Sequence, residues 1–247
     1  TIEIANTGTS PNNIVTLLVS GPTATTLRLT AGLFSSGAGN VLNIGTNGFV
    51  TNNGGNIDSS SIGGTISFVG AGTVNGTTAT TFRNVNINAG AVNIPIGATI
   101  PLVAGSLQIN GGNLTNPPKY GSASTLIYNT SYDRYVEWNY VGIGTIATSA
   151  GYPNNVTIAD GTFDVYNNAT GEARACNGTL TINNDAILNC NNMNSTLTVG
   201  DNLVIAIDGS FNMNTMSAAL IVNDNISISG TLSLSTDFNG SLYLGGN

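Results

Sequence analysis

The chemically reactive side chains of this sequence are few, and the two cysteines are the first to consider. Cys176 and Cys190 lie fourteen residues apart, and the chain contains no histidine to accompany either one. Both fall in apolar stretches that alternate like strands, where a free cysteine packs as a small hydrophobic residue. We therefore expect two buried free thiols. A disulfide between them is the alternative, and a metal-binding or catalytic role is disfavoured.

Acids are the next candidates, because paired carboxylates can bind cations or cleave glycosidic bonds. Asp185, Asp201 and Asp224 are the only acids that the repeating pattern brings into near register. Each lies in a turn rich in Asn and Gly, where Asp accepts hydrogen bonds from the local backbone. This local role is the expected one, and weak calcium binding by the row is the alternative. No other metal site and no cofactor are expected.

The densest group of charged and aromatic residues spans positions 132–138. Its charged members are Asp133, Arg134 and Glu137. Its aromatic members are Tyr132, Tyr135 and Trp138. We expect this group to form a salt-bridged cap over one end of a repeat block, with the rings as packing. In the alternative, the three rings line a groove beside the acids and contact glycans.

A recurring phrase indicates which elements position these residues. Four copies occur about 17 to 24 residues apart, at Gly178–Ile182, Ser195–Val199, Ala218–Val222 and Gly240–Leu244. Such recurrence is typical of a solenoid, in which each unit buries its apolar face against its neighbours. The period-two alternation predicts strands with one face inward. Turn residues recur in register after each copy, which favours a parallel β-helix over a sandwich.

Aligning the copies predicts which residues share a column of the core. Cys176 falls in the column of Met193, and Cys190 in that of Ile207. A looser form of the pattern predicts inward pairs in the N-terminal half: Leu27/Leu29, Leu42/Ile44, Ile66/Phe68, Val85/Ile87 and Leu107/Ile109. The prediction is an all-β, right-handed parallel β-helix of about ten to twelve rungs. It comprises a block over 1–118, a junction over 119–153, and a regular block over 154–247 that continues beyond this segment.

The amino-acid composition of the chain limits the classes of partner it is expected to bind. Only 7% of the residues are charged, and five basic residues stand against twelve acidic ones, for a net charge of −7. So few cations cannot neutralise a phosphate backbone, so nucleic acid is not an expected partner. No apolar run reaches the roughly 18 to 20 residues of a membrane span, so no membrane insertion is expected. Richness in Asn, Thr, Ser and Gly with a single Lys favours an extracellular or cell-surface location.

Three stretches carry a resemblance to a known group of proteins. They are Glu137-Trp138, Gly151–Ile158 and Ala173–Ile182, which read EW, GYPNNVTI and ARACNGTLTI. This block resembles the repeat regions of large secreted and surface proteins of Bacteroidota, which are commonly exported by the type IX secretion system. The resemblance covers about residues 120–247 and implies a β-solenoid in an adhesin, a filament protein or the stalk of a larger enzyme.

The expected function is therefore that of a structural or adhesive module of an exported surface or filament protein, without catalysis. Its expected partners are copies of itself or a continuation of the same solenoid, and surface glycans. One alternative is a carbohydrate-binding or polysaccharide-cleaving β-helix. Another is the stalk of a larger secreted cargo protein.

Overall fold

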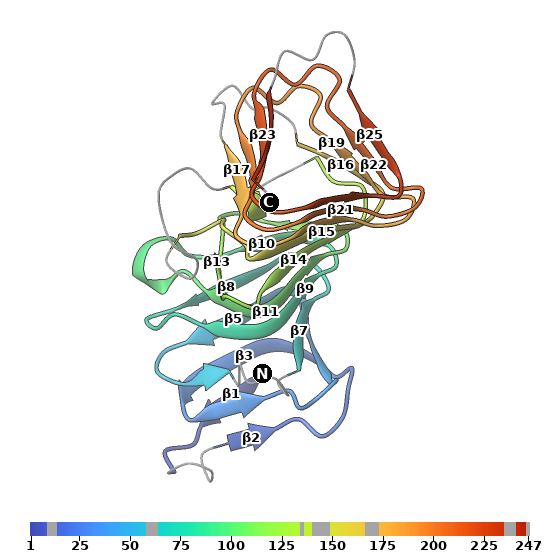
Figure 1. Ribbon diagram of the computed structural model, residues 1–247. Helices are drawn as coiled ribbons and strands as arrows, with labels where there is room; N and C mark the ends of the chain where they lie inside the picture. Colours follow the sequence, from blue (N-terminus) through green and yellow to red (C-terminus); the bar gives the residue numbers. More distant parts are fainter. Residues whose placement is uncertain are drawn as a thin grey trace. The chain divides into compact units, whose positions relative to one another are not determined.

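The computed structural model describes residues 1–8, 14–57, 64–133, 136–139, 149–165, 173–234 and 241–245. In this part the chain is almost entirely parallel β-structure wound into stacked coils, a β-solenoid of about nine turns (Figure 1). The predicted parallel solenoid is confirmed, with slightly fewer turns than expected. The chain divides into two compact units, Thr1–Gly121 and Ser122–Asn247.

The N-terminal unit contains two long runs of parallel strands and a small third sheet. One run comprises β5 (Val41–Asn52), β7 (Thr65–Phe68), β9 (Thr81–Ile87), β11 (Leu102–Ile109) and β13 (Lys119–Tyr120). The other comprises β1 (Ile2–Ala5), β3 (Thr23–Ala31), the second half of β5, β8 (Gly72–Gly76), β10 (Gly90–Asn93) and β12 (Gly112–Leu114). The small sheet comprises β2 (Ile14–Thr16), β4 (Leu33–Ser35) and β6 (Asn56–Ile57). A short 3₁₀ turn, η1 (Gly97–Thr99), precedes β11.

The five predicted inward pairs of this unit all lie in its core. Leu42, Ile66, Val85 and Leu107 stack in register along β5, β7, β9 and β11, and each is buried. Leu27 stacks instead on Val50, in the second half of β5. Alternation along a strand is a local property, so the sequence reveals the buried face even where the spacing between coils varies.

The C-terminal unit is built from coils of three strands, each strand belonging to a different sheet. The first sheet comprises β14 (Thr125–Asn129), β15 (Asn155–Asp160), β18 (Leu180–Ile182), β21 (Leu203–Ile205) and β24 (Ile226–Ile228). The second comprises β16 (Thr162–Asp164), β19 (Ile187–Asn189), β22 (Ser210–Asn212) and β25 (Thr231–Ser233). The third comprises β17 (Arg174–Cys176), β20 (Leu197–Val199), β23 (Ala219–Val222) and β26 (Ser241–Leu244). In Figure 1 the second and third sheets stand on opposite sides of the first.

The register within these sheets corrects the alignment of the repeated phrase. Leu180 pairs with Val156 and Leu203 in the first sheet, whereas Leu197 pairs with Arg174 and Leu220 in the third. The first copy of the phrase thus belongs to a different sheet from the other three. Strands of both sheets carry the same inward apolar pair followed by an Asn, Gly or Asp turn, so the phrase alone does not identify the sheet.

The corrected register also changes which residues stack on the two cysteines in the core. Cys176 pairs with Val199, not with Met193. Cys190 lies at the end of the second sheet, where its N–H donates to the carbonyl of Asn212. Ile207, predicted to share its column, lies in the corner after β21 with 57% of its surface exposed. The predicted column partners of both cysteines were therefore wrong.

The expected junction over 119–153 is divided between the two units. β13 pairs with β11 in the N-terminal unit, and β14 pairs with β15 in the C-terminal unit. The boundary at Gly121 lies close to the expected end of the first block at residue 118. A short 3₁₀ turn, η2 (Val136–Trp138), carries two of the residues singled out in the sequence.

Candidate functional site

The aromatic residues of the 132–138 group pack around Phe163 inside the C-terminal unit. Ring centroids lie 4.1 Å from Phe163 for Tyr128, and 6.1 Å for both Tyr132 and Trp138. All four rings are buried. Stacked aromatic rings with this burial contribute packing energy to a core. The expected packing role is what this geometry supports, and the completely buried ring of Trp138 offers no surface to a glycan. Tyr135 lies outside the described residues.

The polar atoms of Tyr132 and Trp138 in this buried aromatic cluster make hydrogen bonds inside the unit. The Tyr132 hydroxyl lies 3.0 and 3.1 Å from the two carboxylate oxygens of Glu137. The Trp138 indole N–H donates to the carbonyl of Ala175 over 2.8 Å. Glu137 is fully buried, where an ionised carboxylate requires hydrogen bonds or an opposite charge. These bonds hold η2 within the unit.

Arg174 is a member of this interior that the sequence analysis did not single out. It occupies the inward position of the third sheet, in the column of Leu197 and Leu220, and is buried. Its guanidinium donates to Asn139 Oδ1 at 3.4 Å and to the carbonyl of Ala173 at 3.2 Å. The alternation Ala-Arg-Ala-Cys before the phrase was the available signal. Arg134, expected in the salt-bridged cap, lies outside the described residues.

The predicted row of acids is split between two corners of the coil. Asp201 and Asp224 share one corner, where the N–H of Asp224 donates to the carbonyl of Asp201 at 3.2 Å. Asp185 lies in another corner. The ladders on both sides of that corner advance by 23 residues (182 to 205 and 187 to 210), which places Asp185 in register with Asp208. The predicted near register of Asp185 with the other two was therefore wrong.

Local hydrogen bonds occupy the carboxylates of Asp201 and Asp224, and the backbone conformation of its turn explains Asp185. Asp201 accepts hydrogen bonds from Thr179 Oγ1 at 3.2 Å and Asn202 Nδ2 at 2.9 Å. Asp224 accepts from Asn225 Nδ2 at 2.7 Å. Asp185 has a φ of 60°, a left-handed conformation that Asp adopts more readily than most residues. Within the described ranges, no three His, Cys, Asp or Glu side chains gather closely enough to hold a metal ion.

Both cysteines are free and buried, as predicted. Burial raises the pKa of the Cys176 thiol to about 12, and hydrogen bonds with the backbone of Gly200 and of Cys176 itself only partly oppose this rise. Burial raises the pKa of the Cys190 thiol as well, and the nearby Arg174 charge only partly opposes it. A thiol with a raised pKa is a poor nucleophile near neutral pH, because the thiolate is the reactive form.

A shallow polar hollow on the C-terminal unit is lined by Ser131, Tyr132, Asp133, Thr162 and Asp164. Asp133 and Asp164 flank the isolated bridge between Tyr132 and Phe163, on adjacent strand segments. The Asp164 carboxylate accepts a hydrogen bond from Asn189 Nδ2 at 2.6 Å. This hollow, rather than the predicted aromatic groove, brings hydroxyls and two carboxylates together on the surface.

The last coil of the C-terminal unit exposes the columns that every earlier coil buries. Leu220 and Val222 in β23 are completely buried, whereas their partners Leu242 and Leu244 in β26 are 40% and 61% exposed. Leu234, just after β25, is also exposed, as is Ile228 at the end of β24. In β24, β25 and β26, apolar side chains of the inward columns are thus exposed to solvent.

Comparison with protein-family models, with curated proteins and with solved structures found no match to this chain. In the described part of the chain, no helix has the length and apolar character needed to cross a bilayer. The class defined here is a parallel β-solenoid with three-stranded coils in its C-terminal unit.

Proposed function

We propose that this chain is a structural or adhesive module of an exported cell-surface or extracellular filament protein, without catalytic activity. The observation that carries the proposal is the stacking of the coils, in which β24, β25 and β26 carry apolar side chains that a further coil of the same kind would cover. Strand edges offer unpaired backbone groups, and natural proteins normally protect them with charge, proline, bulges or a covering segment. The residues of these three strands include no charge and no proline.

The chemistry of this edge fits another coil of the same kind. Within the unit, Leu220 and Val222 are covered by Leu242 and Leu244. A further coil with the same pair of inward apolar residues would cover Leu242 and Leu244 in turn, and its backbone would extend the ladder. That coil would come either from a continuation of the same solenoid or from a second copy of the chain, which would join modules end to end.

Sedimentation velocity and light scattering over a range of concentrations test this proposal. We expect reversible self-association that Leu244→Lys abolishes, since the new charge would be buried in the contact. Tyr243→Lys is the matched control, because Tyr243 lies in the same strand but on the opposite face and is 58% exposed. A chain that stays monomeric at all concentrations, or equal effects of the two lysines, would contradict the proposal.

Export and the link to type IX secretion are part of the proposal. They are supported by the richness in Asn, Thr and Ser and by the resemblance of the EW, GYPNNVTI and ARACNGTLTI stretches to Bacteroidota surface proteins. Mass spectrometry of surface-shaved and medium fractions of the source cells tests them. The architecture of the full gene product separates a filament or adhesin, with many further coils, from the stalk of a larger cargo protein.

Glycan binding is a second candidate, supported by the polar hollow rather than by Trp138. Carboxylates and hydroxyls such as those of Asp164 and Thr162 can pair with sugar hydroxyls. A glycan array with the purified chain, followed by a polysaccharide-cleavage assay, tests this role. Binding that Asp164→Asn weakens and Asp224→Asn preserves would support it, and an array without signal would reject it.

A further inference from the structure

The N-terminal unit has an exposed apolar surface around strand β2. Ile14 and Val15 in this strand are each 39% exposed, and Leu18 and Val19, which follow it, are 86% and 62% exposed. Large apolar side chains that are exposed together in this way mark interaction surfaces more often than single exposed residues do. These four residues are called the β2 patch below.

One member of the β2 patch belongs to a column that is buried elsewhere in the small sheet. Val15 pairs with Phe34 in β4, and Phe34 pairs with Ile57 in β6. Phe34 and Ile57 are both buried, in contrast to Val15. Val15 therefore occupies an inward position, and among the described residues no strand on the other side of β2 covers it.

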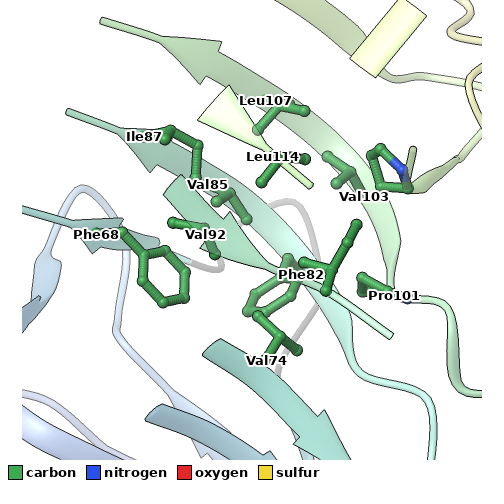
Figure 2. A pocket seen from close by; sticks show the side chains of 12 residues that line it. Phe68, Val74, Phe82, Val85, Ile87, Val92, Pro101, Val103, Leu107 and Leu114 are labelled. Atoms are coloured by element: carbon green, nitrogen blue, oxygen red, sulfur yellow. The ribbon is translucent and has the colours of Figure 1, made fainter. Parts of the chain in front are cut away.

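Strands in the middle of the same unit show how such inward positions are normally buried. Val85, Val92 and Leu107 are buried, and Figure 2 shows them pointing toward a common interior. β9 lies between β7 and β11, and β10 lies between β8 and β12. A strand on each side thus accompanies burial of the inward residue, and β2 has such a neighbour on one side alone in the part of the chain described here.

The backbone of β2 is suited to pair with a further strand. The N–H of Leu17 donates to the carbonyl of Ser35 at 2.7 Å, on the side of β4. The N–H of Thr16 points to the other side of β2, because the N–H groups of successive residues in a strand alternate in direction. The stretch Ile14–Ser20 contains no charge and no proline, which are the usual protections of a strand edge.

Strand β26 carries the matching chemistry. Leu242 and Leu244 are exposed members of columns that are buried at Leu220 and Val222. Like β2, β26 is short, has a parallel neighbour and contains no charge and no proline. Because the chain has a net charge of −7, two copies repel each other, and contact is least opposed where two uncharged strands meet.

We propose that the β2 patch is the surface that receives β26 of a second copy of this chain, as a parallel strand beside β2. Leu242 and Leu244 would then cover Val15, and the apolar columns would continue from one copy into the next. This inference rests on the proposed self-association and identifies the surface that β26 contacts. Since the two surfaces differ, the contact is heterologous and joins copies head to tail.

Sedimentation velocity of lysine variants tests the contact. Val15→Lys places a charge in it and should weaken association by about tenfold or more. Ile14→Lys is the matched control, because Ile14 is equally exposed but faces the opposite side of the same strand. It should associate like the unmodified chain. Circular dichroism verifies that the variants are folded.

A second variant, Thr16→Pro, keeps the test decisive if Val15→Lys does not fold. It removes the N–H that points away from β4 without adding a charge, and an edge strand tolerates proline at such a position. Association of a folded Thr16→Pro or Val15→Lys chain at the strength of the unmodified chain would overturn the inference.

Mixing two blocked chains tests the head-to-tail arrangement. The Val15→Lys chain keeps an intact β26, and the Leu244→Lys chain keeps an intact β2 patch. Each should stay monomeric alone, and their equimolar mixture should form heterodimers that grow no further. A mixture without heterodimers would overturn the inference, as would dimers of the Leu244→Lys chain alone, which would indicate pairing of β2 with β2. Both results leave self-association of the unmodified chain standing, whereas an unmodified chain that stays monomeric would contradict the proposed function as well.

Discussion

The indole nitrogen of Trp138 donates a 2.8 Å hydrogen bond to the carbonyl oxygen of Ala175, a residue 37 positions away in the chain. This bond links η2 to β17 and is completely buried. Trp138→Phe would keep an aromatic ring against Phe163 but leave the Ala175 carbonyl without this donor. An unsatisfied buried acceptor costs about 1 to 3 kcal/mol, so we expect that loss in the free energy of unfolding, measured by urea denaturation with circular dichroism.

The control for this variant is Tyr243→Phe, which also removes a polar group from an aromatic residue. Tyr243 is exposed, so its hydroxyl is solvated in both the folded and the unfolded chain. Its removal should change the free energy of unfolding by no more than about 0.5 kcal/mol. Equal stability of the two variants would show that the Trp138 bond contributes nothing. Trp138 is the only tryptophan, so its fluorescence in the unmodified chain should shift to longer wavelength on unfolding.

The C-terminal unit should not tolerate a charge in its first sheet. Ile205 is buried between Ile182 and Ile228 in register. Ile205→Asp would bury an unpaired carboxylate, and we expect destabilisation by more than about 3 kcal/mol, enough to abolish cooperative unfolding of this unit. Circular dichroism during thermal unfolding measures the loss.

Val204→Asp is the matched control because Val204 is the next residue of the same strand and faces outward. It should keep the β-rich spectrum and the cooperative transition. A folded Ile205→Asp protein, or an unfolded Val204→Asp protein, would mean that the inward and outward faces of β21 are reversed.

The two buried thiols should make stability fall at alkaline pH. The thiol pKa of Cys176 rises from 9.0 to about 12 on folding, so between these values the folded chain keeps a proton that the unfolded chain has lost. Stability contributed by the neutral thiol is complete below pH 9 and declines above it, by about 1.4 kcal/mol per pH unit for each such thiol. The raised pKa of Cys190 acts in the same direction.

Urea denaturation of the unmodified chain and of a Cys176→Ala/Cys190→Ala variant between pH 8 and pH 10.5 isolates this contribution, since other titrating groups are common to both. The unmodified chain should lose stability more steeply above pH 9. A thiol reagent at pH 8 should react with neither cysteine until urea unfolds the chain. Parallel pH curves, or rapid reaction of the native protein, would contradict the buried environment of the thiols.

The sequence predicted buried faces better than it predicted neighbours. Leu107 and Ile205 were correctly predicted as core residues, because the alternation of apolar and polar residues along one strand is a local signal. The partner of Leu180 was misassigned because strands of the first and third sheets carry the same apolar pair and similar turns. Ile207 was assigned to the core although it lies in a corner, where the period-two alternation no longer applies.

In the candidate site, too, the sequence did not predict which distant segments lie next to one another. The packing role of Trp138 followed from its place beside other rings, but its bond to Ala175 depends on a contact between distant segments. Arg174 is buried at an apolar column position, where sequence alone favours an exposed charge. The polar hollow requires Tyr132 and Phe163 to lie in neighbouring coils, and spacing in the sequence does not reveal that register.

Two glycines of the N-terminal unit allow the cost of a left-handed backbone conformation to be measured apart from the cost of steric crowding. Gly90 and Gly39 have similar positive φ angles, 67° and 71°. An added Cβ at Gly90 would lie 2.5 Å from the nitrogen of Ala71, whereas one at Gly39 would meet no atom within 4 Å. Alanine in this left-handed region costs about 1 to 2 kcal/mol, so Gly39→Ala should lose that amount. Gly90→Ala should lose clearly more, because the strands must also move apart. Urea denaturation of both variants measures the difference, and equal losses would mean that the coils at Gly90 and Ala71 are less closely packed than described.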